Sequence, residues 1–361
     1  MKIGIVTLPL SRNFGGILQN YALQTKLTEM GHESMTIDIG KYTWLDCFIE
    51  YLKYIIKLLL GKKPPKPLLP SEYQKRELVL RRFVLENIDL TTPRMRKISS
   101  SVVDKNDFQA IVVGSDQVWR PKYAYNIYDM YLNFARRKKI KKIAYAASFG
   151  VGKWEYTLVQ TKICRELISK FDAVSVRESS AVHLCERYLK IPAVHVLDPT
   201  LLLTDKDYNK LIEDIPVKES KIFAYFLDSS KKKIAFAKMV AKYMGLQIEF
   251  KSAGSKLDNN DSIENWLVNF RDSDYVITDS FHGCAFSIIY NKPFSVISNK
   301  SRGQDRMSSL LGLMDLTDRI LYDEVLNDVR IEGEIDWTRV NAKLNELRTI
   351  SLEYLQTQLE K

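Results

Sequence analysis

The chain of 361 residues is too long for one ordinary hydrophobic core, so we expect two domains. With 45% hydrophobic and 27% charged residues, its composition is that of a globular protein and excludes a fibrous or low-complexity chain. The net charge of +10 favours phosphorylated small molecules or an anionic membrane surface over nucleic acid, because the basic residues are dispersed among acidic ones.

The first predicted unit is a strand, a loop and a helix. Residues 2–8 are rich in apolar and β-branched side chains, residues 11–16 form a loop with paired glycines, and residues 17–30 repeat apolar side chains at helical spacing. Paired glycines let backbone amides approach a ligand closely. Asn13 and Gln19 offer hydrogen bonds to sugar hydroxyls. The alternative is a tight turn that binds no ligand.

A basic apolar segment follows a second predicted strand at residues 35–39. Residues 51–60 are mostly apolar, yet lysines interrupt them and they are far fewer than the roughly 20 needed to span a bilayer. As a helix, the segment has a broad apolar face with lysines close by, which is typical of helices in an anionic membrane interface. We therefore expect peripheral membrane attachment here. The alternative is a core helix followed by an exposed proline-rich loop. The lysines concerned are Lys53, Lys57, Lys62 and Lys63.

Two further strands end in polar side chains. The apolar strand 110–113 leads into Gly-Ser-Asp-Gln-Val-Trp, where Asp116 is a candidate acid or base, or a ligand of a hydroxyl. The strand 173–176 delivers Arg177, which can hold a carboxylate or phosphate through two parallel hydrogen bonds. The alternatives are that Asp116 caps the next turn and that Arg177 forms an ion pair with Glu178 or between domains.

Further elements are predicted in the first half, and two histidines among them, His183 and His195, are interpreted as structural. The elements are a charged amphipathic helix at 71–88, a strand at 142–147 that ends at Ser148, a helix at 156–170, and the helix and strand that carry His183 and His195. Residues 197–200, Leu-Asp-Pro-Thr, are interpreted as the exit from the first domain.

The second half repeats the alternation of strands and helices. Serial strand–helix units with short connections favour parallel sheets in both halves. We predict one domain over residues 1–200, a second over 201–335 and a C-terminal amphipathic helix over 336–361. Predicted strands are 221–227, 246–250, 275–278 and 293–297, and predicted helices are 231–243, 262–270, 283–290 and 307–313.

The stretch from Asp279 to Gly283 is the strongest candidate site. It lies between a predicted strand and helix, where open α/β sheets bind their ligands and where free helix amides suit a phosphate or carboxylate. His282 is one of four histidines and the only one at such a junction. The alternative is a capping turn, with Asp279 or Ser280 as the N-cap and a packed histidine beside it.

Two smaller observations concern anions and metals. The polar loop 301–306 presents Arg306 as a second candidate anion ligand, unless it forms a surface ion pair. The four cysteines have no metal-ligand spacing, so we expect buried, reduced thiols in a cytosolic protein and no metal site. These cysteines are Cys47, Cys164, Cys185 and Cys284.

Six segments together resemble the polysaccharide pyruvyl transferase family. They are NFGGILQNYAL, VVGSDQVW, YAASFG, SVRES, LDPTLLL and VITDSFHGCAFSIIYNKPF, in family order from about residue 3 to about 315. The resemblance implies two Rossmann-like domains in a glycosyltransferase-B-like arrangement with the active-site cleft between them. It also implies phosphoenolpyruvate as donor, a sugar hydroxyl pair as acceptor, and a role in bacterial surface polysaccharide. Family members commonly carry Arg-Leu-His where this chain has Ser280, Phe281 and His282, so Arg177 or Arg306 would supply the missing charge.

The chemistry of phosphoenolpyruvate requires cations for its two anionic groups, an acid near its methylene and a base near the acceptor hydroxyl. We assign His282 as general acid/base, assisted by Asp116, with Arg177 holding the donor; no cofactor is needed. Residues expected to bind the donor are Arg177, Ser280, Phe281, His282, Gly283 and Arg306. Residues expected to bind the acceptor are Asn13, Phe14, Gly15, Gly16, Gln19, Ser115, Asp116, Gln117 and Ser148.

Two rival functions stay open at this point. A nucleotide-sugar glycosyltransferase would share the architecture, and a non-catalytic glycan-binding subunit of a polysaccharide assembly complex would share the acceptor contacts. Titratable groups at several strand ends favour an enzyme. We expect a cytoplasmic protein that contacts the inner face of the membrane, with a sugar acceptor that is free or lipid-linked.

Overall fold

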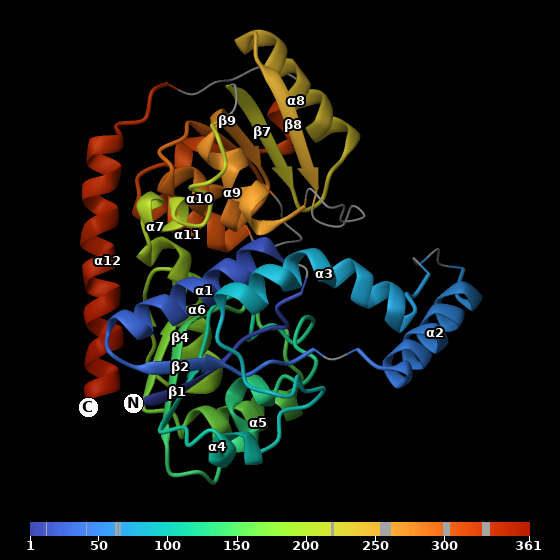
Figure 1. Cartoon of the computed structure of the whole chain (residues 1–361), viewed down its shortest axis with the longest axis vertical. Helices are drawn as coiled ribbons and strands as arrows, with labels where there is room; N and C mark the ends of the chain where they lie inside the picture. The colour runs from blue at the N-terminus through green and yellow to red at the C-terminus, as the bar shows by residue number, and fades with distance from the viewer. Residues whose placement is uncertain are drawn as a thin grey trace.

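The computed structural model describes residues 1–11, 13–40, 42–61, 64, 66–217, 220–252, 261–298, 304–326 and 333–361. Two parallel β-sheets with helices on their faces form the molecule, one in each half of the chain (Figure 1). The strand order is β2-β1-β3-β4-β5-β6 in the first sheet and β11-β10-β9-β7-β8 in the second. The expected α/β class, with parallel sheets in both halves, is therefore confirmed.

The central strands are short apolar runs, as buried parallel sheets require, whereas the outer strands β2 and β8 carry more polar residues. In the first sheet the strands are β1 (Lys2–Val6), β2 (Glu33–Thr36), β3 (Ala110–Val113), β4 (Lys141–Ala147), β5 (Ala173–Val176) and β6 (Val194–His195). In the second they are β7 (Lys221–Phe226), β8 (Gln247–Ser252), β9 (Ser273–Thr278), β10 (Phe294–Ile297) and β11 (Ile320–Leu321).

Helices connect the strands in both units. In the first they are α1 (Phe14–Glu29), α2 (Trp44–Leu59), α3 (Pro70–Asn87), α4 (Ser101–Lys105), α5 (Leu158–Ile168) and α6 (Ser179–Leu184). The remaining helices, in chain order, are α7 (Asp205–Asn209), α8 (Lys231–Met244), α9 (Ile263–Arg271), α10 (Phe281–Ile289), α11 (Gln304–Leu313) and α12 (Trp337–Glu360).

The first turn of α1 corrects one expectation. The glycine pair was expected in a loop before a helix at Ile17, but the helix begins at Phe14, directly after the extended residue Asn13. Gly15 and Gly16 are therefore buried helical residues. Their lack of a side chain serves close packing rather than an open loop.

One apolar cluster joins the two units. Phe14 of α1 stacks on Trp266 of α9, with ring centroids 5.7 Å apart and planes 5° apart, and it meets Tyr225 of β7 edge-on. Residues of both sheets and of α12 belong to this same cluster. The relative placement of the sheets therefore depends on continuous buried contact rather than on a single linker.

The C-terminal helix α12 returns to the first unit and runs along the side of the molecule (Figure 1). Arg348 donates to the carbonyl oxygens of Leu201 and Leu203 at 2.6 and 2.9 Å, and Ser351 Oγ accepts from the amide of Leu197 at 3.1 Å. Its apolar face, predicted from the spacing, is buried at Val340, Leu344 and Leu355.

All four cysteines are buried free thiols, as expected. Burial raises the pKa of Cys164 to about 12 and raises the pKa values of Cys185 and Cys284 further. None of the helices in the described part of the chain combines the length and the hydropathy needed to cross a membrane.

Replacing Leu355 by Ala tests the docking of α12. Leu355 is fully buried, so the substitution removes packed methyl groups, and we expect a loss of ~2–5 kcal/mol in the free energy of unfolding. Chemical denaturation would measure it. Ile350 on the same helix is 47% exposed, and Ile350→Ala is the matched control, with an expected change within ~0.5 kcal/mol. Equal effects of the two substitutions would contradict the docking.

Candidate active site

A cleft of about 740 Å³ lies between the two units. In each sheet the chain reverses its direction of strand addition once, between β1 and β3 and between β7 and β9. Loops after these four strands all contribute to the cleft, as expected for α/β sheets, which bind ligands at such switch points. The lining residues are Thr7, Leu8, Pro9, Ser11, Asn13, Gly16, Tyr73, Asp116, Gln117, Tyr123, Leu227, Ser280, Phe281, His282 and Arg306.

His282 lines the cleft from the first turn of α10. Its ring is nearly buried, and its Nε2 lies 3.9 Å from Asp198 Oδ2 and has no hydrogen-bond partner among the described residues. Burial lowers the pKa of His282 to about 4; Asp198 opposes this shift, while the cations Arg177 and Arg306 add to it. The imidazole is therefore neutral near pH 7 and can accept a proton.

Gly15 explains how the first unit holds this histidine. A Cβ atom at Gly15 would lie 2.0 Å from His282 Nδ1 and 2.1 Å from its Cγ, so the ring packs directly on the helix backbone. The glycine was expected to bind the acceptor. Instead it makes room for a side chain of the other unit.

Asp116 presents its carboxylate to the cleft from the end of β3. Its backbone has φ +67°, in the left-handed region that side chains other than glycine rarely adopt. Oδ2 accepts a hydrogen bond from Asn13 Nδ2 at 3.1 Å, and Oδ1 lies 3.5 Å from Arg177 Nη2. The next residue, Gln117, also lines the cleft, and its Oε1 accepts from Arg120 at 3.0 Å.

Arg177 lies beneath the cleft and does not line it. Its side chain is 1% exposed, and Nη1 donates to Asp198 Oδ2 at 2.5 Å. Phe281 of the second unit covers the guanidinium, whose central carbon lies 4.5 Å from the ring centroid. Although burial opposes its charge, Asp198 and Asp116 raise the pKa of Arg177. The arrangement matches the alternative of an ion pair, but with Asp198 and Asp116 rather than with Glu178.

Arg306 supplies the cation that does line the cleft. It projects from the first turn of α11, and its guanidinium carbon lies 5.8 Å from the centroid of Phe281, the ring that also covers Arg177. Burial and, after it, the charge of Arg177 together lower the pKa of Arg306 to about 10, although Asp116 and Glu178 oppose the shift. It remains charged near pH 7. Residues 301–303 of the loop expected before it lie outside the described residues.

Two residues at the start of α10 have structural tasks. Ser280 is the N-cap, and its Oγ accepts from the amide of Gly283 at 3.3 Å, although Ser280 also lines the cleft. Gly283 is packed against Thr278, whose Oγ1 would lie 2.2 Å from an added Cβ. The preceding Asp279 accepts from Lys233 Nζ at 2.6 Å and from the amide of Leu227.

Two residues expected to contact the acceptor point elsewhere. Phe14 is used in the stack on Trp266, and Gln19 Nε2 donates to Thr7 Oγ1 at 3.0 Å and to a backbone oxygen. Thr7 lines the cleft, so Gln19 supports the lining from behind. Neither Phe14 nor Gln19 is part of the cleft wall.

The two expected serines support carboxylates that were not predicted as site residues. Ser115 Oγ donates to Asp198 Oδ2 at 2.8 Å, and Ser148 Oγ donates to Glu178 Oε1 at 2.9 Å. Asp198 also accepts from Thr200, and despite its burial the charge of Arg177 lowers the pKa of Asp198 to about 2. Burial raises the pKa of Glu178. The available signal for Asp198 was a carboxylate three residues after the end of a strand, β6.

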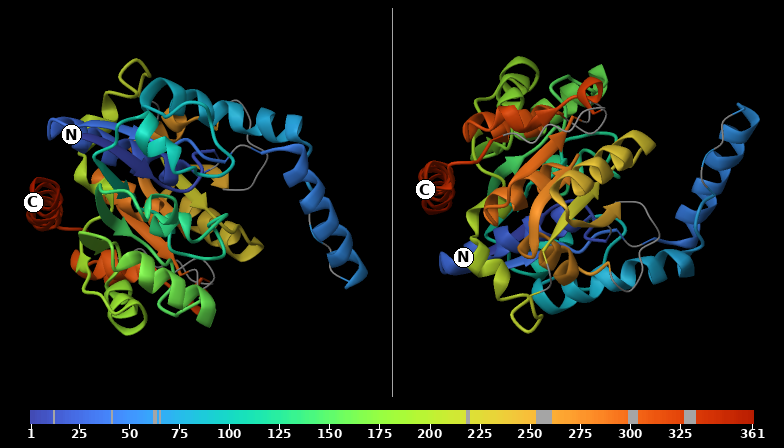
Figure 2. Two further views of the ribbon diagram at one scale, coloured as in Figure 1. Left: turned by 90° about the horizontal axis from the view of Figure 1, so that it is seen from below. Right: turned by 90° about the horizontal axis from the view of Figure 1, so that it is seen from above.

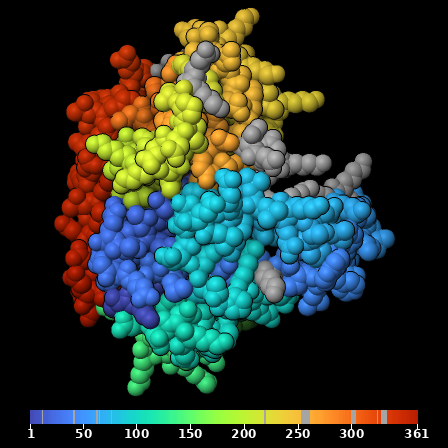
Figure 3. All heavy atoms as spheres, viewed as in Figure 1, coloured from blue at the N-terminus to red at the C-terminus, as the bar shows by residue number. Residues whose placement is uncertain are grey.

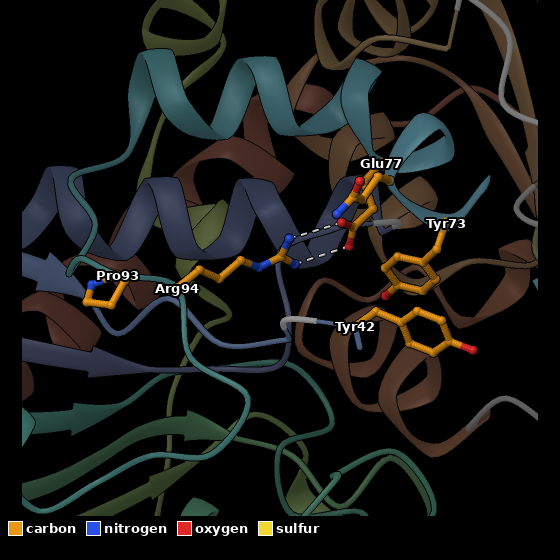
Figure 4. Close-up of a pocket in the computed structure, with 6 residues that line it drawn as sticks. Tyr42, Tyr73, Glu77, Pro93 and Arg94 are labelled. Carbon is orange, nitrogen blue, oxygen red and sulfur yellow. Dashed lines mark hydrogen bonds and ion pairs between the residues drawn. The ribbon is translucent and has the colours of Figure 1, made fainter. Parts of the chain in front are cut away.

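A smaller cavity of about 240 Å³ lies beside the cleft, under α3 (Figure 4). Arg94 reaches across it and donates to both oxygens of Glu77, at 3.0 and 3.1 Å. Tyr73 stacks on Tyr42 with ring centroids 4.5 Å apart, and Tyr73 also lines the cleft. The ion pair therefore fixes the helix that carries an aromatic wall of the cleft. Within the described residues, no three His, Cys, Asp or Glu side chains group as metal ligands.

Comparison with known sequence families shows to which family this chain belongs. The sequence model of the polysaccharide pyruvyl transferase family matches residues 13–301, which include every cleft residue from Asn13 to His282. The chain belongs to the polysaccharide pyruvyl transferase family. No curated protein sequence matches it.

Two solved structures are similar to this polysaccharide pyruvyl transferase family member at low identity. UDP-GlcNAc 2-epimerase of Methanocaldococcus jannaschii is 11% identical, with a TM-score of 0.48 over 97% of this chain and 99% of that chain. A UDP-glucosyltransferase from Polygonum tinctorium is 11% identical, with a TM-score of 0.47 over 100% of this chain and 98% of that chain.

Replacing Gly15 by Ala tests the packing of His282 in this pyruvyl transferase family member. The new Cβ would overlap the imidazole, so we expect a loss of ~1–3 kcal/mol in the free energy of unfolding, measured by chemical denaturation. Gly312 on α11 has open space around its added Cβ, and Gly312→Ala should instead gain up to ~1 kcal/mol. A stable Gly15→Ala variant would show that the ring does not need this contact.

The pH dependence of stability tests the burial of His282. In the unfolded chain the histidine binds a proton below its ordinary pKa of 6.5, whereas in the folded protein it does so only below about 4. Between these values the unfolded state binds more protons, so stability falls as the pH drops; the interval corresponds to ~3 kcal/mol. Denaturation at several pH values measures the effect. Between pH 7 and pH 4, we expect the free energy of unfolding of His282→Gln to fall by ~3 kcal/mol less than that of wild type. The exposed His183→Gln should follow wild type.

Proposed function

We propose that the protein transfers the enolpyruvyl group of phosphoenolpyruvate to two hydroxyls of a sugar, forming a pyruvate ketal in a bacterial capsular polysaccharide or exopolysaccharide. Membership of the polysaccharide pyruvyl transferase family supports transfer of this group to a polysaccharide. The observation that carries the proposal is the meeting of a neutral histidine, a carboxylate and an arginine in one cleft between the two units.

The donor is proposed to bind on the side of the second unit. Arg306 faces the cleft with its charge, and the first turn of α10 adds the partial positive charge of its helix end. Arg177 was our first choice for this contact, but its guanidinium is covered by Phe281 and bound to Asp198. We therefore propose that Arg306 contacts the donor and that Arg177 positions Asp116.

The acceptor is proposed to bind on the side of the first unit. Asn13, Asp116 and Gln117 line that wall with amide and carboxylate oxygens, which suit sugar hydroxyls. Tyr73 and Tyr123 add aromatic surface at the same wall. The reacting hydroxyl would then lie between Asp116 and His282.

The proton balance of the reaction fits a single group that accepts and returns a proton. Two hydroxyl protons leave the sugar; one ends on the methylene carbon of the donor, and the other leaves with phosphate. A neutral His282 with an open Nε2 can accept a hydroxyl proton as general base. An anionic donor bound beside it raises its pKa, which prepares the imidazolium to give the proton back. Asp116 stabilises the developing positive charge.

Loss of His282 tests this assignment. We expect His282→Gln to lower the rate of phosphate release from phosphoenolpyruvate, in the presence of an acceptor glycan, by more than ~100-fold, the usual scale of acid–base catalysis. The exposed His183→Gln serves as the matched control and should keep the wild-type rate. Full activity of His282→Gln would refute the role of the histidine.

Ligand-induced stabilisation tests the donor site separately. A ligand at 100 times its dissociation constant adds about 2.7 kcal/mol to stability, and this shifts a melting curve visibly. We expect phosphoenolpyruvate to stabilise wild type and His282→Gln but not Arg306→Met, with the exposed Arg339→Met as control. Stabilisation by a nucleotide sugar but not by phosphoenolpyruvate would instead support a glycosyltransferase.

A further inference from the structure

Helix α2 stands out from the body of the molecule with its apolar side uncovered. Figures 1 and 2 show it projecting beyond both sheets, and Figure 3 shows the region as a protrusion of the surface. Seven large apolar side chains on it are 45% to 82% exposed: Trp44, Leu45, Phe48, Leu52, Ile55, Ile56 and Leu59. We call these seven residues the α2 stripe. The alternative of a core helix, considered from the sequence, is wrong.

The α2 stripe is one continuous face. Its members recur three and four residues apart, from Trp44 through Phe48, Leu52 and Ile55 to Leu59, and therefore lie along one side of the helix. Helices of globular proteins usually turn such a face towards the core. A patch of this size that stays exposed marks a contact surface.

The polar side of α2 borders a cavity instead. Lys53, Tyr54 and Lys57 line a cavity of about 480 Å³ whose other wall is the proline-rich return segment, which contributes Lys66 and Leu68. No member of the α2 stripe lines this cavity, and Lys53 and Lys57 stay exposed at its edge, so the helix presents both an apolar face and positive charge to solvent. Lys62 and Lys63, which were expected to add charge here, lie outside the described residues.

Contacts at the N-terminal end of α2 attach the helix to the body of the protein, so the α2 stripe has a defined orientation. Thr43 and Asp46 form a capping box, and Arg96 donates to Asp46 Oδ1 at 3.0 and 2.8 Å. Burial alone would raise the pKa of Asp46. The hydrogen bonds from Arg96 and Thr43 outweigh this effect and lower the pKa of Asp46 to about 2. Cys47 Sγ donates to the carbonyl oxygen of Leu68 at 3.5 Å.

We infer that the α2 stripe docks in the interface of an anionic lipid bilayer. With 16 residues, the helix is ~24 Å long and suited to lying in the membrane plane. Its charges select the partner: Arg96 compensates Asp46, and Lys53 compensates Glu50 at 2.8 Å, which leaves Lys57 and Lys66 as the excess positive charge beside the stripe. Anionic headgroups attract such lysines.

A second copy of the chain is a poorer occupant for the same reason. Self-association through the stripe would bring the lysines of two copies together, and like charges at an interface oppose binding. The helix offers two acids, Asp46 and Glu50, and both already have cationic partners. A bilayer with anionic lipids supplies the complementary charge for the second half of the helix, which carries Lys53 and Lys57.

Docking would also bring the cleft close to the membrane surface. Tyr73 lines both the cavity under α2 and the active-site cleft, so the two spaces adjoin. For the proposed pyruvyl transfer, on which this step alone rests, the placement suits an acceptor that stays attached to lipid. The membrane contact itself does not depend on the reaction.

Co-sedimentation with vesicles tests the inference. We expect the full chain to bind vesicles of phosphatidylcholine with phosphatidylglycerol, to bind vesicles of phosphatidylcholine alone more weakly, and to dissociate as salt is added. The triple substitution Ile55→Gln, Ile56→Gln and Leu59→Gln should reduce binding at least tenfold. Three exposed apolar residues elsewhere provide the matched control, which should bind like wild type. The control carries Leu78→Gln, Leu85→Gln and Ile350→Gln.

Two outcomes would overturn the inference. One is vesicle binding that is absent in wild type or unchanged in the triple α2 variant. The other is a dimer in sedimentation that the same substitutions abolish, without any vesicle binding. The substituted residues are exposed, so melting curves should show an intact fold. Stabilisation by phosphoenolpyruvate is measured on the same variant, and its persistence would show that a failure here leaves the proposed reaction untouched.

Discussion

The ion pair between Arg177 and Asp198 is the constraint on which the cleft depends. A buried guanidinium without a counter-ion is strongly destabilising, so the surrounding loops must deliver a carboxylate to it. Asp198 does this while accepting hydrogen bonds from Ser115 and Thr200, which joins the ends of β3, β5 and β6. Phe281 then closes over the guanidinium from the second unit. The same ionic centre that organises the first sheet thus positions the start of α10.

Charges around His282 are arranged so that the protein groups alone favour a neutral imidazole. Burial and the two arginines disfavour the imidazolium, and Asp198 compensates only in part. An anionic ligand adjacent to Arg306 would change this balance, because it adds negative charge where the protein has placed positive charge. Fixed groups of this kind need little rearrangement during a reaction. The protonation state of the histidine therefore becomes linked to occupancy of the site.

The sequence was sufficient for the fold and for the location of the cleft. Continuous apolar runs alternate with amphipathic ones, and carboxyl ends of parallel strands gather at one edge, so Asp116 and His282 could be expected to converge. It was not sufficient for partners distant in sequence. Nothing in the neighbouring sequence identifies Asp198 as the counter-ion of Arg177, or Gly15 as the residue on which the ring of His282 packs.

Helix phase explains the residues that were expected in the cleft wall but lie behind it. Successive side chains of a helix point about 100° apart, so with α1 beginning at Phe14 only some residues of the segment 14–19 can face the cleft. Phe14 turns into the core, and Gln19 turns towards Thr7. Asn13, just outside the helix, keeps its side chain for Asp116.

Helix α2 shows a different limit of sequence reasoning. Periodicity identifies which face of a helix is apolar, but whether that face is covered depends on what the neighbouring chain can bring to it. The return segment after α2 is rich in proline and lysine and packs on the polar side, so it leaves the apolar side without a partner within the described residues. Apolar surface of this extent is costly in water. The anionic bilayer that we propose as the partner would cover this surface and would meet the lysines beside the stripe.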